Sequence, residues 1–418
     1  MIRVLWFSNS PVSAGKVKNI NFTGGSWIKA LESAFTDIPG YQLGIVCQLK
    51  TPSLEKYVID NVRYYICPVT SGFEKRKIGW GGNYILNDDV AVKTYLKVID
   101  DFKPDIIQIF GTENNYGLVI PFTEVPAIIH IQGFLSMYVK KYFSGMLLSD
   151  IEKHTPTLKI IKGVTEINYF NYFKNLEARE SKIVAKTKYF FGRTSWDYRI
   201  VKTLGSAKYF HCDEMLRNEF HINSWKQPSG NTIIISSTLS AAPYKGFDLI
   251  YETAEKLAKL KIPFIWNIIG SSDNAEIVRL LVKKYHHPFP LQVKMVGNKT
   301  TNELIDILLQ SHIYVHPSYI DNSPNSVCEA MILGMPVCAV STGGVPSLID
   351  NRVDGMLVNA GDPYDMTGAI LELIENPEFA KHIGENARKR SLKRHDPANI
   401  LKTIISTYKI MLHESKQL

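Results

Sequence analysis

The chain has 418 residues, of which 45% are hydrophobic and 21% are charged, ordinary proportions for a folded protein that buries a sizeable core. These values exclude a disordered chain, a fibre and a disulfide miniprotein, and no apolar run approaches the roughly 20 residues of a membrane span. Lysine and arginine outnumber the acids by 48 to 40, so the net charge is +8. This moderate excess suits polyanions, phosphates or anionic membrane surfaces without choosing among them.

Cysteine usage and the start of the chain bear on the cellular compartment. The five cysteines are odd in number and form no close pair, so they do not suggest a disulfide framework, and no C-x-x-C zinc spacing occurs. The first residues enter a strand pattern directly, without a signal peptide. The sequence predicts a cytoplasmic protein with no metal site.

Short apolar runs alternate with helical patterns along nearly the whole chain. Runs of strand length lie at 2–8, 42–48, 62–69, 104–111, 126–133, 188–194, 232–238, 264–270, 293–297, 313–318, 336–341 and 355–359. Helical patterns lie at 26–35, 90–102, 247–259, 275–284 and 301–310, and another helix begins before Cys328. Such alternation predicts parallel sheets covered by helices on both faces. The fold class is therefore α/β, with two Rossmann-like doubly wound domains that bind ligand at the carboxyl ends of their strands.

The polar segment 218–230, which contains proline and glycine, is the candidate linker between the domains. The first domain is expected at 1–217 and the second at 218–396. The loop after the first strand lacks G-x-G-x-x-G, which removes the main support for dinucleotide chemistry. It contains Gly24 and Gly25 directly before a helix. Either these glycines let the phosphate or sugar of a ligand approach the backbone closely, or they form a glycine cap in a surface loop.

The stretch 314–358 carries the most specific signal. A strand ends near Ser318, a polar loop follows, and a helix begins near Asn325 or Ser326. The N–H groups at that helix start, with the positive end of the helix dipole, are suited to a diphosphate. Glu329, about one turn into the helix, is placed to accept two hydroxyl hydrogen bonds, as a ribose diol offers. Asp321, on the loop, is placed to accept hydrogen bonds from sugar hydroxyls.

This region resembles the retaining GT-B glycosyltransferases of glycosyltransferase family 4, and its S-P-N-S loop is similar to that of bacterial surface-polysaccharide enzymes. The E-x7-E motif of that family falls on Asp321 and Glu329, with aspartate in the first position. The resemblance implies that Asp321 faces the donor sugar and that Glu329 holds the nucleotide ribose. It also implies that the C-terminal helix, 397–418, crosses back to the first domain. The remaining donor contacts expected on this loop are Asn322, Ser323, Asn325 and Ser326.

A second family landmark is a basic pair that grips the diphosphate after the first strand of the second domain. Lys245, followed by glycine, matches its lysine, whereas Thr238 stands where the arginine would fall. Because charge on the leaving diphosphate must be neutralised, one cation fewer matters. The expected substitutes are Lys16, Lys18 or Arg193.

A third landmark is a histidine at the end of a strand in the first domain, and Gln132 occupies its place. We expect Gln132 and Gly133 to line the sugar site, with Gln132 unable to transfer protons. His130, on the same strand face, is expected in the core. Glu113 is a candidate acceptor contact. Arg193 is another, unless it forms a buried ion pair with Asp197 or Glu214.

The resemblance implies a hexosyltransferase-like enzyme of polysaccharide biosynthesis that moves a sugar from a nucleotide diphosphate sugar to the hydroxyl of a glycan or a lipid-linked glycan. The resemblance also implies that the configuration at the anomeric carbon is retained and that the enzyme needs no cofactor and no obligatory metal. The alternative is a catalytically weak nucleotide-sugar or carbohydrate binder of the same fold, because of Asp321, the missing arginine and the missing histidine.

The segments 134–147 and 158–176 mix aromatic residues with lysines. They are either core-facing helices with a solvated lysine face or elements that make transient contact with the inner face of a membrane. No basic and aromatic motif of a nucleic-acid-binding module occurs, so nucleic acid is not an expected partner.

Overall fold

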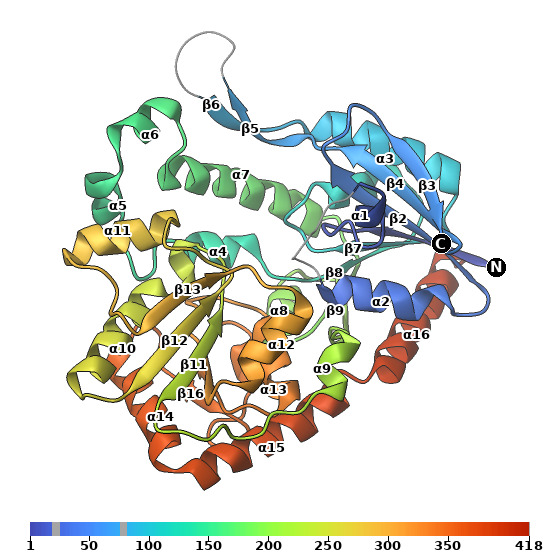
Figure 1. Ribbon diagram of the computed structural model, residues 1–418. Helices are drawn as coiled ribbons and strands as arrows, with labels where there is room; N and C mark the ends of the chain where they lie inside the picture. The colour runs from blue at the N-terminus through green and yellow to red at the C-terminus, as the bar shows by residue number, and fades with distance from the viewer. Residues whose placement is uncertain (19–25, 76–81, 418) are drawn as a thin grey trace. The chain divides into compact units, whose positions relative to one another are not determined.

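The computed structural model describes residues 1–18, 26–75 and 82–417 (Figure 1). Its internal contacts divide the chain into two compact units, each an α/β unit built on a mainly parallel sheet. The first unit comprises Met1–Val139, Thr157–Met215 and His395–Leu418. The second unit comprises Lys140–Pro156 and Leu216–Arg394.

The sheet of the first unit has the strand order β10-β9-β8-β7-β1-β2-β4-β3, and every neighbouring pair is parallel except β3 with β4. Its strands are β1 (Ile2–Phe7), β2 (Tyr41–Leu49), β3 (Glu55–Ile59), β4 (Val62–Pro68), β7 (Ile106–Phe110), β8 (Ala127–His130), β9 (Tyr189–Gly192) and β10 (Lys208–His211). A separate antiparallel hairpin joins β5 (Ser71–Lys75) to β6 (Gly82–Leu86).

Several helices of the first unit begin at residues whose side chains cap the helix start. The helices of this unit include α1 (Ala14–Val17), α2 (Ser26–Thr36), α3 (Asp88–Phe102), α6 (Thr157–Lys162), α7 (Glu166–Val184), α8 (Ser195–Lys202) and α16 (Pro397–Ser415). Thr165 and Thr194 form capping boxes at the starts of α7 and α8. Helix α4 (Leu135–Lys141) begins in the first unit and ends at the boundary with the second.

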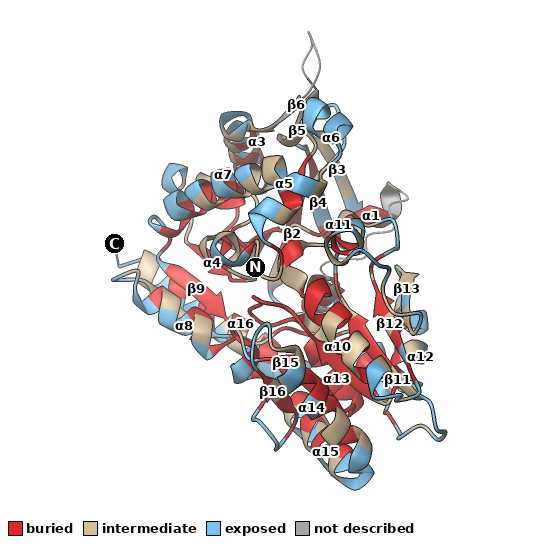
Figure 2. Cartoon of the chain, turned by 90° about the vertical axis from the view of Figure 1, so that its left-hand side faces the viewer, coloured by how far each residue is buried: buried red, intermediate tan, exposed pale blue. Residues whose placement is uncertain are grey.

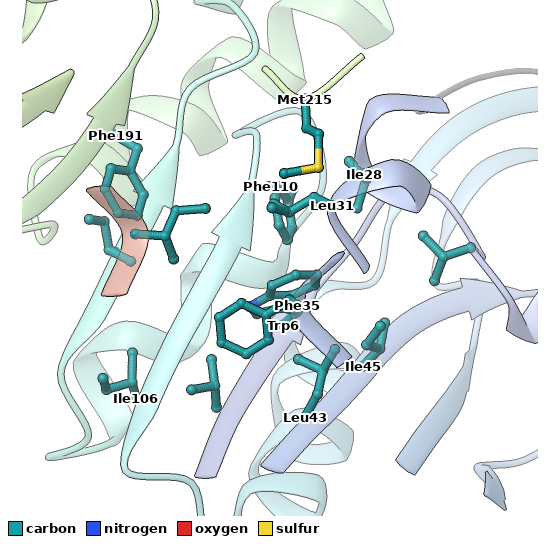
Figure 3. Packing of buried hydrophobic residues seen from close by; sticks show 14 of the residues in the cluster. Trp6, Ile28, Leu31, Phe35, Leu43, Ile45, Ile106, Phe110, Phe191 and Met215 are labelled. Atoms are coloured by element: carbon teal, nitrogen blue, oxygen red, sulfur yellow. The ribbon is translucent and has the colours of Figure 1, made fainter. Parts of the chain in front are cut away.

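The central strands of the first sheet are apolar on both faces, as a sheet covered by helices on both sides requires. All five residues of β7 are buried, and the strands are drawn as buried in Figure 2. One core cluster gathers Trp6, Phe35 and Phe110, with ring centroids 5.1 and 5.3 Å from Trp6 (Figure 3). Helix α16 completes this cluster with Tyr408 and lies beside α2 (Figure 1).

Changing Tyr408 to phenylalanine is expected to lower the free energy of unfolding of the first unit by about 1–3 kcal/mol. The Tyr408 hydroxyl accepts a hydrogen bond from Trp6 Nε1 at 3.1 Å and donates one to Gln108 Oε1, and all three residues are buried. The variant leaves both partners without that bond, since phenylalanine has no polar atom. Urea titration measures the loss, and Tyr198→Phe, at a tyrosine that is 42% exposed, is the control expected to change little.

The sheet of the second unit has the order β13-β12-β11-β14-β15-β16, and all its neighbouring pairs are parallel. Its strands are β11 (Ile233–Thr238), β12 (Phe264–Ile269), β13 (Val293–Gly297), β14 (Ile313–His316), β15 (Val337–Val340) and β16 (Met356–Val358). Its helices are α5 (Leu148–His154), α9 (Asn218–Ile222), α10 (Phe247–Lys259), α11 (Glu276–Tyr285), α12 (Thr301–Leu309), α13 (Asn325–Leu333), α14 (Pro363–Glu375) and α15 (Pro377–Arg394). Helix α13 is buried from Val327 onward (Figure 2).

The division of the chain differs from the sequence expectation in two places. Segment 218–230 is not a linker: it begins with α9, and Phe220 and Trp225 are buried in the core of the second unit. Lys140–Pro156, expected in the first domain, has its contacts in the second unit. The last helix, by contrast, belongs to the first unit, and the chain enters that unit again at His395.

Candidate functional site

The loop 317–324, between β14 and α13, lies at the carboxyl end of the second sheet and is fixed by its neighbours on both sides. Tyr319 donates its N–H to Tyr244 O at 2.9 Å, and Gly344 donates its N–H to Asp321 O at 2.9 Å. The loop is packed so closely that a Cβ added at Gly343 would lie 2.0 Å from Asp321 O. These contacts hold the residues of the loop in defined positions before any ligand binds.

The side chain of Asp321 is the electrostatic centre of this loop. Lys245 Nζ donates to both of its carboxylate oxygens, at 3.0 and 2.9 Å, and His316 Nε2 lies 3.1 Å from Oδ2. Burial alone would raise the pKa of Asp321, but the Lys245 ammonium and the hydrogen bond from His316 outweigh it and hold the pKa well below its usual range. The structure thus brings together Asp321 and Lys245, which are 76 residues apart.

Helix α13 begins at Asn325 directly after this loop. Pro324 is its N-cap residue and makes no side-chain cap, so a proline stands where Ser, Thr or Asp would normally accept the first N–H groups. Asn325 and Ser326 are partly exposed in the first turn, whereas Asn322 and Ser323 are buried beneath it. Asn325 Oδ1 finds no hydrogen-bond partner among the described residues. A helix start without a side-chain cap leaves N–H groups that are suited to an anion.

Glu329, one turn into α13, is buried and paired. Arg217 Nη2 donates to Glu329 Oε1 at 2.6 Å. Burial raises the pKa of Glu329, and the charge and hydrogen bond of Arg217 act against that rise. Thr238, at the end of β11, donates its N–H to the Tyr314 hydroxyl at 3.2 Å, so the place of the expected family arginine is occupied by a neutral residue.

A second cluster of polar side chains lies at the carboxyl ends of β1, β7 and β8 in the first unit. Gln132 Nε2 donates to Asn9 Oδ1 at 3.4 Å, and Asn9 Nδ2 donates to Glu113 Oε1 at 2.8 Å. All three side chains are partly exposed. Burial raises the pKa of Glu113. Gln132, expected at the sugar site, and Glu113, a candidate acceptor contact, are thus joined through Asn9, and Gly133 follows Gln132 directly in the chain.

Arg193 is not available to an acceptor. It is 3% exposed, its Nη1 lies 3.6 Å from Glu214 Oε2, and its Nη2 donates to Gln132 O at 3.1 Å. The structure therefore favours the structural alternative, in which Arg193 forms a buried ion pair with Glu214 and supports the backbone of Gln132. His130 is fully buried among Trp27 and other aromatic rings, and burial lowers its pKa to about 3.

Gly24 and Gly25 lie outside the described residues. Of the cations suggested as substitutes for the missing arginine, Lys18 pairs with Glu55 at 2.6 Å, in the first unit.

Sequence reasoning missed Asn9, Arg217 and the contact of His316 with Asp321. Asn9 follows β1 by two residues, and polar residues just after a parallel strand are the signal that could have found it. Arg217 and His316 form their contacts with side chains from other elements, so no local spacing marks them.

Glu180 is a buried acid that organises the same end of the first sheet. Its carboxylate accepts hydrogen bonds from the Thr112 hydroxyl and from the N–H groups of Leu135 and Ser136, at 3.1 and 3.2 Å, at the start of α4. Burial raises its pKa to about 7. The carboxylate thereby holds in place the segment that follows Gln132 and Gly133.

Changing Glu180 to glutamine is expected to alter how stability depends on pH. The pKa of Glu180 is higher in the folded chain, about 7 against 4.5, so the folded state binds the extra proton and its unfolding free energy falls as pH rises between these values. The shift corresponds to on the order of 3 kcal/mol. Urea titrations from pH 4.5 to 7.5 should show this slope reduced in Glu180→Gln. The exposed Glu124, changed to glutamine, should leave the slope as it is.

The comparisons with known proteins agree with this architecture. Residues 218–390 match the family described as Glycosyl transferases group 1. Sucrose-phosphate synthase from Thermosynechococcus elongatus aligns over 99% of this chain and 100% of its own, with a TM-score of 0.70 and 14% identity. Anabaena HepE, solved in complex with UDP and glucose, aligns over 98% of this chain and 100% of its own, with a TM-score of 0.61 and 14% identity.

The curated relatives match more narrowly. An uncharacterized glycosyltransferase of Methanocaldococcus jannaschii is 26% identical over 151 residues, which is 36% of this chain and 41% of that protein. The chain thus spans about two fifths of this relative's length. An N-acetylgalactosaminyltransferase of Campylobacter jejuni, which acts on N,N'-diacetylbacillosaminyl-diphospho-undecaprenol, is 23% identical over 74% of this chain and 78% of its own.

The chain therefore has the GT-B fold, with two Rossmann-like units. Its second unit carries the region that matches the group 1 glycosyltransferases, residues 218–390.

Proposed function

We propose that the chain is a retaining glycosyltransferase that moves a hexose-type sugar from a nucleotide diphosphate sugar to a hydroxyl of a glycan or a lipid-linked glycan. The observation that carries this proposal is the loop 317–324, in which Asp321 pairs with Lys245 and which leads directly into a helix start without a side-chain cap, at the carboxyl edge of one sheet. The group 1 match at residues 218–390 and the relatives named above support the same activity.

In this proposal the diphosphate lies at the start of α13, against the N–H groups of Asn325 and Ser326, and the ammonium of Lys245 balances the charge that develops as the glycosidic bond breaks. Asp321 accepts hydrogen bonds from the transferred sugar, and Glu329 accepts them from the ribose. In the first unit, Gln132, Asn9 and Glu113 are the proposed contacts for sugar hydroxyls. The leaving phosphate itself takes the proton of the acceptor hydroxyl, so the reaction needs no protein base.

Thermal-shift measurements with UDP, GDP, ADP and their sugars test the donor half of the proposal, since a ligand that binds only the folded state raises the melting temperature. HepE and TarM, another structure with this fold, were solved with UDP, so UDP is the first probe. A shift with one nucleotide class supports the proposal. No shift with any of them contradicts it.

Replacing Glu329 with alanine is expected to reduce the affinity for the best nucleotide at least tenfold, because two charge-assisted hydrogen bonds to the ribose are lost. Isothermal titration calorimetry measures this change. Glu303→Ala, at an exposed cap of α12, is the control for a general effect of removing an acid from this unit. An unchanged affinity in Glu329→Ala would reject Glu329 as the ribose ligand.

The acceptor side includes a surface suited to anionic lipid. Helix α6 of the first unit carries Leu158, Ile160 and Ile161, which are 46–57% exposed and lie among Lys159 and Lys162. The helix is drawn as largely exposed in Figure 2. We propose that this α6 surface makes transient contact with anionic membranes while the chain modifies a lipid-linked acceptor. None of the described helices combines the length and the apolar character needed to cross a membrane.

Vesicle co-sedimentation tests the α6 surface. Each lysine near an anionic surface contributes about 1 kcal/mol, so changing Lys159 and Lys162 to glutamate should weaken binding to phosphatidylglycerol vesicles by more than tenfold. Val58→Asp, at an isolated exposed valine, should leave binding unchanged. Binding that persists in the double variant, or that salt does not weaken, would contradict the proposal.

A further inference from the structure

Arg217 joins three elements of the second unit at the point where Glu329 is buried. It is the N-cap residue of α9, its Nη1 donates to Thr301 Oγ1 at 2.6 Å in the first turn of α12, and its Nη2 donates to Glu329 Oε1 at 2.6 Å in α13. The guanidinium also lies over the Phe220 ring, 4.7 Å from its centroid. Arg217 and Glu329 are 112 residues apart in the sequence, so this contact is created by the fold of the unit.

The contact fixes the guanidinium on two sides. Phe220 is fully buried and Glu329 is 5% exposed, so neither can move away without opening the core of the unit. Both terminal nitrogens of Arg217 are used, one on a neutral hydroxyl and one on a carboxylate. Since a planar guanidinium presents its donors in a rigid fork, two bonds in different directions fix its orientation and that of the carboxylate.

Only one oxygen of Glu329 is engaged. Arg217 binds Oε1, and Oε2 has no hydrogen-bond partner in the part of the chain that the structure describes. A carboxylate held by one oxygen presents the other in a defined direction. An ionised carboxylate only accepts hydrogen bonds, whereas a protonated carboxyl carries one O–H donor and accepts more weakly. A diol that donates its hydroxyl hydrogens is therefore matched best by the ionised form.

The burial of Glu329 makes the negative charge of its carboxylate energetically unfavourable. Burial raises the pKa of Glu329, and Arg217 is the group that opposes the rise. The Tyr314 phenol of β14 also interacts electrostatically with Glu329, but burial raises its pKa to about 12, so it stays neutral. From α15, which packs against α13, Arg388 donates instead to the carbonyls of Asn223, Ile332 and His221.

We infer that Arg217 is a positioning residue for nucleotide binding, which holds Glu329 ionised through Oε1 and leaves Oε2 aimed at the nucleotide's ribose. This inference rests on the proposed function, because it explains how Glu329, the proposed ribose ligand, keeps its negative charge. Arg217 itself touches Glu329 and Thr301 and requires no contact with the nucleotide.

The test is the affinity for UDP, followed by GDP and ADP if UDP does not bind, measured by calorimetry between pH 5.5 and 8.5. In Arg217→Met, the uncompensated Glu329 carboxyl holds its proton to higher pH. The affinity relative to the unchanged chain should therefore fall at least tenfold at pH 5.5 and recover toward pH 8.5. Arg217→Lys, which keeps a positive charge, should restore most of the affinity at low pH.

Two controls separate the possible outcomes. Arg352→Met removes an exposed arginine of the same unit that pairs with Glu372, and it should keep the affinity ratio near one at every pH. A loss in Arg217→Met that is equal at all pH values would mean that Arg217 binds the nucleotide directly or only supports the fold, and it would overturn the inference. Failure of the unchanged chain to bind any of the three nucleotides would instead overturn the proposed function.

Discussion

Lys245→Met is expected to lower the rate of sugar transfer about 100- to 1000-fold, the effect typical of removing one group that stabilises charge in a transition state. In the proposed reaction the leaving diphosphate gains negative charge as the glycosidic bond breaks, and the neutral Thr238 provides no second cation there. Methionine keeps an apolar stem of similar length and removes the ammonium, with its charge and its hydrogen bonds to Asp321. The rate constant for transfer, measured with a radiolabelled donor, reports the loss.

The same variant should also change the acid limb of the pH profile. Lys245 is the largest influence that lowers the pKa of Asp321, so its removal lets burial raise that pKa and shifts the loss of activity to higher pH. Lys245→Arg, which keeps the charge, should retain more activity than Lys245→Met. Lys259→Met, at an exposed lysine at the end of α10, should retain full activity. Full activity in Lys245→Met would remove Lys245 from the mechanism.

Most of the fold could be predicted because its signals are local. Apolar runs such as Ile106–Phe110 are buried on both faces, and this burial is what makes a parallel strand recognisable in one sequence. Strand β3 and the hairpin of β5 and β6 were missed. They are antiparallel additions at a sheet edge or outside the sheet, with half-exposed residues that dilute the apolar pattern.

Segment 218–230 shows how polarity can mislead. Its proline, glycine and polar residues suggested a linker, yet Phe220 and Trp225 anchor it in the core of the second unit. Trp225 donates its ring N–H to Ser311 O at 2.7 Å, so even its polar atom is satisfied inside. Two aromatic residues were enough to override the composition of the whole segment.

In the candidate site, too, some residues can be predicted from local sequence, whereas their partners depend on how distant elements pack. The positions of Asp321, Glu329 and the start of α13 follow from one continuous stretch of sequence, so spacing alone could indicate them. The partners of these acids, Lys245 at 76 residues and Arg217 at 112 residues, depend on how separate elements pack. Arg193 could not be decided from the sequence, because whether a guanidinium is exposed or paired with Glu214 depends on the same packing.

Gly246→Ala is expected to abolish sugar transfer. It should also destabilise the second unit by more than the backbone strain of a side chain at a positive φ would account for. Gly246 has a φ of +77°, and the strain of a side chain there costs about 1 kcal/mol. The Cβ would also lie 2.2 Å from Pro317 O, a backbone atom at the start of the loop that carries Asp321. Either the loop or Lys245 must move, and both carry groups that bind the diphosphate in the proposed function.

Gly297→Ala separates the effect of backbone strain from the effect of the collision with Pro317 O. Gly297 has a φ of +69° in the same unit, but an added Cβ would meet nothing within 4 Å, so it carries the conformational strain without the collision. Urea titration should give a loss of about 1 kcal/mol for Gly297→Ala and at least twice that for Gly246→Ala. Because a displaced Lys245 no longer neutralises Asp321, nucleotide affinity should fall in Gly246→Ala even where the chain remains folded. Equal stability and equal affinity in the two variants would show that the contact of Gly246 with Pro317 does not fix the site.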